Sequence, residues 1–201
     1  MSTAEQAFTV SLVGVGGQGI LRAAAIIAHA AVAAGLDVKS SEIKGMSQRG
    51  GSVLSTVRFG QRVLSPRSDH ADLVIATELL EGLRGLPLLA AGGTMVCAAS
   101  TRIQPGAVLR REQEYPTELA EQAAARGVRL IALDAEALAR QAGNPRTANS
   151  VLLGAASALL PFCDDDWQAG LAKSVPPKTL ETNLLALRLG REATTSQEAR
   201  Q

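Results

Sequence analysis

Residues 8–20 read FTVSLVGVGGQGI, an apolar and β-rich run that passes into a loop with four glycines. The first half of this stretch, Phe8–Val13, predicts a β-strand. Beyond the loop, Ile20, Ala24 and Ile27 recur at helical spacing. Gly35 then stands where the end of a helix favours a left-handed residue. The stretch therefore predicts a strand, a loop and a helix in succession, as at the start of an α/β fold.

Further short apolar runs continue this alternation. Asp72–Ala76 and Met95–Ala99 are apolar almost throughout, which is typical of strands buried on both faces of a sheet. A helix between Pro116 and Gly127 is predicted next, followed by a strand at Val128–Leu133.

Two more strands are predicted between the first helix and Asp72. One lies near Leu36–Ser41, and the second is Ser52–Phe59, where the alternation of side chains predicts one buried face. A turn at Gly60-Gln61 then predicts that Ser52–Phe59 forms an antiparallel hairpin with Arg62–Leu64.

After Asp134 the sequence predicts only helices, at Ala135–Ala142, Asn149–Leu160, Asp164–Ser174 and Lys178–Arg191. We therefore predict an α/β fold, a three-layer Rossmann-like sandwich with a mainly parallel, mixed sheet and a helical C-terminal cap. Residues 1–193 are expected to form a single domain, and residues 194–201 a frayed polar tail.

The composition argues against several classes of function. The 201 residues include 20 Lys and Arg against 19 Asp and Glu, and aromatic residues make up only 2%. Nucleic-acid binding is not expected, because basic patches and stacking platforms are missing. No secretion signal or membrane span is recognised, so we expect a cytoplasmic protein. The two cysteines, Cys97 and Cys163, are expected to be buried thiols.

The glycine loop has the spacing Gly-x-Gly-x-x-Gly at Gly14, Gly16 and Gly19. Such a loop between a strand and a helix brings backbone N–H groups and the positive end of the helix dipole to an anion. The side-chain amide of Gln18 could donate to a ligand oxygen. Packing of a tight turn explains the glycines equally well, and the spacing alone does not separate the two interpretations.

A dinucleotide site would need an acidic residue at the end of the second strand, and Glu42 lies near that place. The loop that follows, Lys44–Ser52, offers cationic and hydroxyl groups to a phosphate or carboxylate, and its glycines offer backbone N–H groups. We expect this loop and the glycine loop to form a crevice at neighbouring strand ends. The alternative is a solvated surface loop.

Taken together, several segments resemble the gamma domain of the pyruvate:ferredoxin and 2-oxoacid:ferredoxin oxidoreductases, and within that family the small (beta) subunit of the indolepyruvate enzymes. The segments are Gly14–Ile20, Glu42–Ser52, Val57-Arg58-Phe59, Ser65-Pro66 and Ala71-Asp72-Leu73. The pairing of a Gly-Gly-Gln-Gly loop with a Gln-Arg-Gly-Gly-Ser loop carries most of the resemblance, which covers nearly all of Phe8–Arg191.

The resemblance implies a subunit that is inactive alone. Larger partner subunits would bind thiamine diphosphate, Mg and iron-sulfur clusters, and would oxidatively decarboxylate a 2-oxoacid, such as indolepyruvate or an arylglyoxylate, to an acyl-CoA. Ferredoxin or another acceptor would take the electrons, and coenzyme A would be the co-substrate. The two cysteines agree with this division, because an iron-sulfur cluster usually takes four.

For this chain the resemblance implies no catalytic residue and no metal ligand, but a share in the substrate and coenzyme A cleft. Arg49 is the strongest candidate for an anion contact, since its planar fork suits phosphate or carboxylate. Asn149 is either such a contact or a helix N-cap. The predicted contact residues are Gly16, Gly17, Gln18, Gly19, Lys44, Ser47, Gln48, Arg49, Gly50, Gly51, Ser52 and Asn149. A stand-alone dinucleotide-binding module and an NAD-dependent dehydrogenase are the alternatives.

Overall fold

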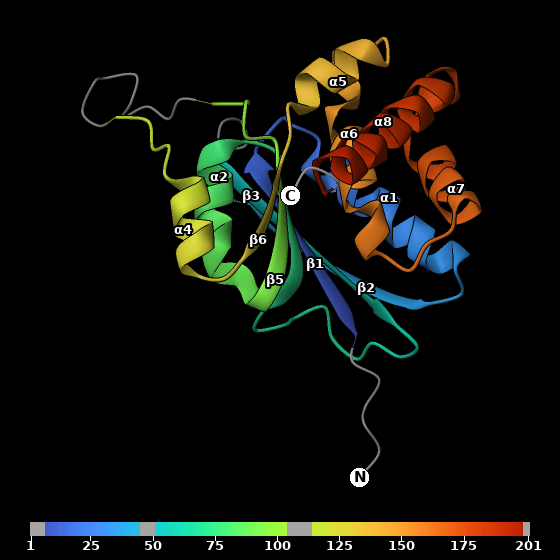
Figure 1. Ribbon diagram of the computed structural model, residues 1–201. Coiled ribbons are helices and arrows are strands. Elements are labelled where there is room, and N and C mark those ends of the chain that lie inside the picture. Colours follow the sequence, from blue (N-terminus) through green and yellow to red (C-terminus); the bar gives the residue numbers. More distant parts are fainter. Residues whose placement is uncertain (1–6, 45–50, 104–113, 199–201) are drawn as a thin grey trace.

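The structure is a computed structural model that describes residues 7–44, 51–103 and 114–198 (Figure 1). Its strands are β1 Phe8–Val15, β2 Asp37–Lys44, β3 Ser52–Gly60, β4 Ala71–Ala76, β5 Leu89–Cys97 and β6 Arg129–Ala132. Its α-helices are α1 Ile20–Ala33, α2 Leu79–Gly85, α4 Leu119–Ala125, α5 Ala135–Gln141, α6 Ala148–Ala156, α7 Asp164–Ser174 and α8 Leu180–Glu198.

The six strands form one mixed sheet in the order β2-β3-β1-β4-β5-β6. Strands β1, β4, β5 and β6 run parallel, whereas β3 is antiparallel to both of its neighbours, β1 and β2. The carboxyl ends of β1, β2, β4, β5 and β6 therefore meet at one edge of the sheet, together with the amino end of β3. The loops at this edge are the ones that the sequence predicts to be functional.

Helices cover both faces of the sheet, which confirms the predicted three-layer α/β sandwich (Figure 1). Successive residues of β4 point to opposite faces: Leu73 and Ile75 pack in the core cluster shared with α1, α6 and α7, and Val74 and Ala76 pack in the cluster shared with α2 and α4. The apolar sequence of this strand is thus explained by burial on both sides.

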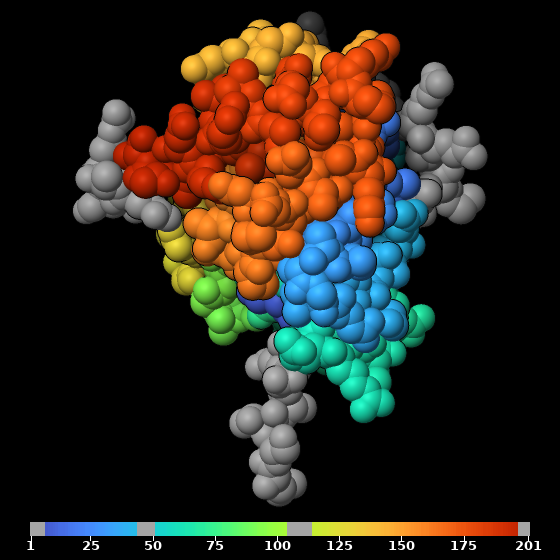
Figure 2. Space-filling model, turned by 90° about the vertical axis from the view of Figure 1, so that its right-hand side faces the viewer, coloured from blue at the N-terminus to red at the C-terminus, as the bar shows by residue number. Residues whose placement is uncertain are grey.

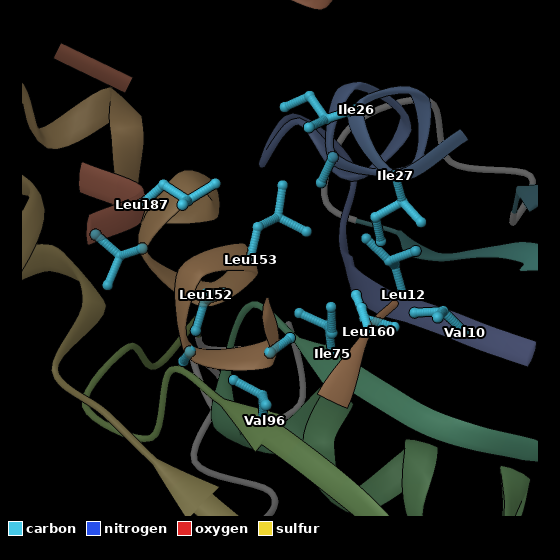
Figure 3. Packing of buried hydrophobic residues seen from close by; sticks show 14 of the residues in the cluster. Val10, Leu12, Ile26, Ile27, Ile75, Val96, Leu152, Leu153, Leu160 and Leu187 are labelled. Carbon is cyan, nitrogen blue, oxygen red and sulfur yellow. The ribbon is translucent and has the colours of Figure 1, made fainter. Parts of the chain in front are cut away.

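The larger core lies between the sheet and the helices α1 and α6. Leu12 and Ile75 rise from the sheet, and Ile27 and Leu153 reach them from α1 and α6 (Figure 3). Ile27 and Leu153 are fully buried. Each such side chain contributes about 1.5 to 3 kcal/mol relative to its exposed state, so this seam is a main source of stability.

The predicted hairpin between Ser52–Phe59 and Arg62–Leu64 is wrong. The hairpin partner of β3 is β2, which extends to Lys44 instead of ending near Ser41. Residues 62–64 are irregular, and the N–H of Val63 donates to the carboxylate of Asp37 at 2.8 Å rather than to a strand. This hydrogen bond from a backbone N–H to a side chain holds residues 62–64 against the start of β2, and no strand pairing is needed.

The helical C-terminal cap is confirmed, and α7 has the predicted bounds. Helices α6 and α8 cross so closely that a Cβ on Gly154 would lie 1.9 Å from the carbonyl oxygen of Leu187, and a Cβ on Gly190 equally close to that of Val151. Glycine at both positions lets the two backbones touch. Figure 2 shows the C-terminal helices on the same face of the molecule as α1, against which α7 packs.

The cap also extends further than the sequence suggests. Thr194, which we expected in a frayed tail, is buried, and its hydroxyl donates to the carbonyl of Gly190 within α8. Among the described residues, no helix is long and apolar enough to cross a membrane.

Candidate functional site

The glycine loop connects β1 to α1 by a turn that only glycine accommodates easily. Gly17 and Gly19 have φ angles of 105° and 79°, a left-handed region that disfavours residues with a Cβ. Gly14 serves packing instead, because a Cβ there would lie 2.0 Å from the hydroxyl oxygen of Thr77. The glycines are therefore explained by the turn and its packing, and binding of an anion by this loop stays a prediction.

Gln18 turns its side chain into the protein. Its Oε1 accepts from the backbone N–H of Val15 and from the hydroxyl of Thr77, both at 2.7 Å, and its Nε2 donates to the carbonyl of Thr77 at 3.2 Å. The amide that we expected to face a ligand thus fastens the loop to the end of β4. One N–H of the amide is left for any other partner.

Asn149 contacts the same loop from a distant part of the chain. It lies in the first turn of α6, and its Nδ2 donates to the carbonyl of Gln18 at 2.8 Å. It is not the N-cap of that helix, since Thr147 holds that position. The structure therefore brings two predicted site residues together.

The second predicted loop is described only at its ends. Lys44 closes β2, and Gly51 and Ser52 lead into β3, whereas Ser47, Gln48, Arg49 and Gly50 lie outside the described residues. The N–H of Gly16 donates to the carbonyl of Gly51 at 2.8 Å. The two loops thus meet at this bond, as we expected of neighbouring strand ends.

Two buried glutamates at the start of α2 hold the residues around these loops, and sequence reasoning missed both. Glu78 is fully buried and accepts from the hydroxyl of Tyr115, and Glu81 accepts from the hydroxyl of Ser52 and from Arg84. Burial raises the pKa of Tyr115, and its hydrogen bond to Glu78 raises that pKa further. The start of β3 and Tyr115 are thereby fixed to one helix.

A cleft of about 530 Å³ opens on the other side of the glycine loop. Gly17, Gln18 and Gly19 form one wall, and residues of the C-terminal cap form the opposite wall. Asn149 lines it too, but neither Gly51 nor Ser52 does. Gly16 thus contacts Gly51, whereas Gly17–Gly19 border the cleft.

Three cationic side chains line this cleft, and the sequence analysis had singled out none of them: Arg22 in α1, Arg146 just before α6, and Lys178 just before α8. Arg22 alone has a sequence signal, because it lies in the first turn of the helix that follows the glycine loop. The arrangement suits an anionic ligand.

The dinucleotide alternative lacks its geometry. A carboxylate that holds a ribose belongs on a strand next to the glycine-loop strand. Here β3 lies between β1 and β2, so the exposed Glu42 of β2 is one strand removed from the loop.

Cys97 is buried, as expected, and burial raises the pKa of its thiol to about 12. The expectation of a buried Cys163 is wrong, because that residue is exposed at the N-cap of α7. Within the described part of the chain, no cluster of three or more His, Cys, Asp or Glu residues is placed to hold a metal ion.

Comparison with known proteins agrees with the resemblance drawn from the motifs. Residues 9–193 match the family described as pyruvate ferredoxin/flavodoxin oxidoreductase. Indolepyruvate oxidoreductase subunit IorB of Thermococcus kodakarensis is 38% identical over 195 residues, which cover 92% of this chain and 95% of that protein. The subunit of the same name from Pyrococcus horikoshii is 36% identical, with the same coverage.

Two solved structures share the fold. The gamma subunit of a keto/oxoacid ferredoxin oxidoreductase from Geobacter sulfurreducens superposes with a TM-score of 0.72 at 23% identity, over 94% of this chain and 99% of that one. A 2-oxoglutarate:ferredoxin oxidoreductase from Magnetococcus marinus gives a TM-score of 0.75 at 21% identity, over 96% of this chain and 32% of that one.

Proposed function

The chain belongs to the pyruvate ferredoxin/flavodoxin oxidoreductase family, and on that premise we propose that it is the small subunit of a complex that oxidatively decarboxylates a 2-oxoacid to an acyl-CoA. The observation that carries the proposal is the match over residues 9–193, which includes both loops that meet at Gly16 and Gly51. The chain contributes binding surface, and the chemistry belongs to cofactors in its partners.

The substrate is an aryl 2-oxoacid, with indolepyruvate first and an arylglyoxylate second. This assignment rests on the IorB subunits, which are 35% to 38% identical to the chain and are named for indolepyruvate. Larger partner subunits in the cytoplasm carry thiamine diphosphate with Mg and the iron-sulfur clusters. The electrons pass to ferredoxin or another acceptor, and coenzyme A accepts the acyl group.

The part played by this chain is to complete the cleft for substrate and coenzyme A. The two loops share one edge of the sheet, and Gly16 joins them through its bond to Gly51. Arg49, between Lys44 and Ser52 in the second loop, supplies an anion contact at the partner interface. Asn149 holds the glycine loop in place through the carbonyl of Gln18.

Co-purification from the native source tests the complex. We expect a larger polypeptide with bound thiamine diphosphate and iron to accompany the chain, and we expect indolepyruvate-dependent reduction of ferredoxin only when both are present. If the chain purifies alone, and its activity needs no such partner, the proposal fails.

Arg49→Ala in the assembled complex tests the loop. Loss of a charge-assisted contact raises the KM for coenzyme A or for the 2-oxoacid about tenfold or more. Arg126→Ala is the matched control, because Arg126 is exposed at the C-terminal end of α4 and its substitution removes the same charge. Equal kinetics of both variants would remove Arg49 from the site.

A further inference from the structure

Both predicted loops are fastened to the short stretch of chain between β4 and α2. The side chain of Gln18, in the glycine loop, is bonded to Thr77, which follows β4 directly. The hydroxyl of Ser52, where the second loop passes into β3, donates to the carboxylate of Glu81 in the first turn of α2. The stretch Thr77–Glu81 therefore holds the two loops together.

The burial of Glu81 is not explained by its place in a helix. The residue is only 2% exposed, and glutamate is almost never buried to this degree unless it is paired. One carboxylate oxygen accepts from Arg84 at 2.5 Å, and the other accepts from Ser52. Burial of a carboxylate costs free energy, which its partners offset only in good geometry.

Helix α4 shows what an acid at this position looks like without such a partner. It has the same length as α2, and Glu121 stands three residues after its N-cap, as Glu81 does in α2. Glu121 is exposed. The helix dipole favours an acid at both positions, and it requires burial at neither. The burial of Glu81 therefore goes with its bond to Ser52.

The Ser52 end of this bond lies where the two loops meet. Ser52 and Val15 form the last pair of the ladder between β1 and β3, and the ends of such elements fray most readily. The carbonyl of the preceding residue, Gly51, accepts from the N–H of Gly16 at 2.8 Å. A bond that holds Ser52 thus also holds Gly51 against the glycine loop.

The Glu81 end of the bond lies on a firmly seated helix. Glu78, the N-cap of α2, accepts from the N–H of Glu81 and from the hydroxyl of Tyr115. A Cβ on Gly82 would lie 3.1 Å from the sulfur of Cys97, and one on Gly85 equally close to a methyl group of Val74. Helix α2 therefore lies directly against the sheet (Figure 1) and gives Glu81 a fixed position.

We propose that Glu81 is a positioning residue for the reaction of the complex. Through the hydroxyl of Ser52 it holds Gly51 against Gly16, in the geometry in which the two loops contact the substrate or coenzyme A. Its effect passes through Ser52 and does not depend on a contact of its own with a ligand. This inference rests on the proposed function, because it assigns a role within that reaction.

Steady-state kinetics of the assembled complex test the inference. Glu81→Ala and Ser52→Ala should each raise the KM for coenzyme A, for the 2-oxoacid or for both by roughly tenfold, and kcat should change by less than about threefold. Because both variants remove the same bond, the double variant should raise KM no further than the larger single effect. Ser52→Thr retains the hydroxyl and should keep the KM of the unmodified complex.

Glu121→Ala is the matched control, since it removes an acid from the same position of a helix of equal length and should leave both KM values unchanged. A merely structural role of Glu81 would reduce the amount of folded complex, and so lower kcat at an unchanged KM. That result would overturn the inference, as would additive effects of Glu81→Ala and Ser52→Ala. If Glu81→Ala does not fold, the contrast between Ser52→Ala and Ser52→Thr decides.

The same measurements separate this inference from the proposed function. A complex that turns over its 2-oxoacid, but whose KM values ignore the substitutions at Glu81 and Ser52, overturns the positioning role and leaves the proposed function standing. A complex that turns over no 2-oxoacid before any substitution is made refutes the proposed function, and the positioning role with it.

Discussion

Gln18 is the residue whose role changed most between sequence and structure. Its side-chain amide joins Val15 to Thr77, so it shapes the glycine loop and keeps one N–H for another partner. Gln18→Ala would leave a backbone donor of β1 without its partner in a partly buried place. We expect the free energy of unfolding to fall by about 2 to 3 kcal/mol, measured by urea denaturation.

The control for that substitution is Gln122→Ala, at an exposed position of α4, which should change stability by less than about 0.5 kcal/mol. Equal stability of the two variants would show that the bonds of Gln18 contribute nothing.

Cys97 allows a prediction about the stability of the protein at alkaline pH. Burial first, and the charge of Glu78 second, raise the pKa of its thiol from the ordinary 9.0 to about 12. Above pH 9 the unfolded chain binds fewer protons than the folded one, so stability is complete below pH 9 and falls as the pH rises toward 12. Tyr115 acts in the same direction, because its pKa is raised too.

Urea midpoints between about pH 8 and pH 10.5 measure this decline, which should approach about 1 kcal/mol for each pH unit above 9. Cys97→Ala loses some stability at every pH because it leaves a cavity, but its decline should be shallower. Parallel curves for both proteins would assign the alkaline loss to other groups.

Single residues also mark the limit of sequence reasoning. Glu78 and Glu81 look like ordinary acids of a first helical turn, and they become buried only because Tyr115 and Ser52 arrive from elsewhere to bind them. Contacts between residues that are far apart in the sequence cannot be predicted from a local sequence pattern.

At the scale of elements, the sequence predicted which face of a strand is buried better than it predicted which strands pair with each other. The alternation in β3 marks a buried face, and Val57 and Phe59 are indeed fully or almost fully buried. The same alternation does not say which strand lies beside it. Backbone hydrogen bonds between strands do not depend on the identity of the side chains. Both Asp37–Lys44 and Arg62–Leu64 were therefore compatible with pairing to β3, and we predicted the wrong one.

A substitution that adds one methyl group tests whether the backbones of α6 and α8 touch where the helices cross. Gly154→Ala adds a Cβ 1.9 Å from the carbonyl oxygen of Leu187, and only a shift of one helix can relieve that contact. We expect a loss of about 2 to 3 kcal/mol in the free energy of unfolding, although alanine is the better helix former by about 1 kcal/mol.

Ala137→Gly, at an exposed position of α5, reports the helix-propensity contribution alone and should cost about 1 kcal/mol. Stabilisation of the protein by Gly154→Ala would mean that the two backbones do not touch in solution.

At the scale of the whole molecule, the cleft beside the glycine loop is lined by residues of α1 and of the cap, so an anion bound there should stabilise the entire fold. Pyrophosphate at a hundred times its Kd would add about 2.7 kcal/mol. For a chain of this size we expect the Tm to rise by roughly 5 to 10 °C in a thermal melt. The double variant Arg22→Gln with Arg146→Gln should lose most of this shift.

Potassium chloride at matched ionic strength is the control for that melt. The same rise with chloride alone would assign the stabilisation to general screening of charge, and not to a site.

The sequence could not predict this cleft as a whole, although it predicted every element that forms it. The glycine loop has a recognisable pattern, but Arg146 stands in a short polar turn that looks like an ordinary connection, and Lys178 was predicted only as the first residue of a helix. Their meaning depends on which helices end up side by side, and that depends on packing over the entire core.

The close crossing of α6 and α8 also bears on how the protein is made. Because α6, α7 and α8 follow all six strands in the chain, the apolar side of α1 and the sheet has no cover until the last residues have been synthesised. Synthesis proceeds at roughly 5 to 20 residues per second, so this surface stays bare for several seconds. Exposed apolar surface of this kind is prone to aggregate during that interval. The cleft beside the glycine loop is complete only when the last helices dock.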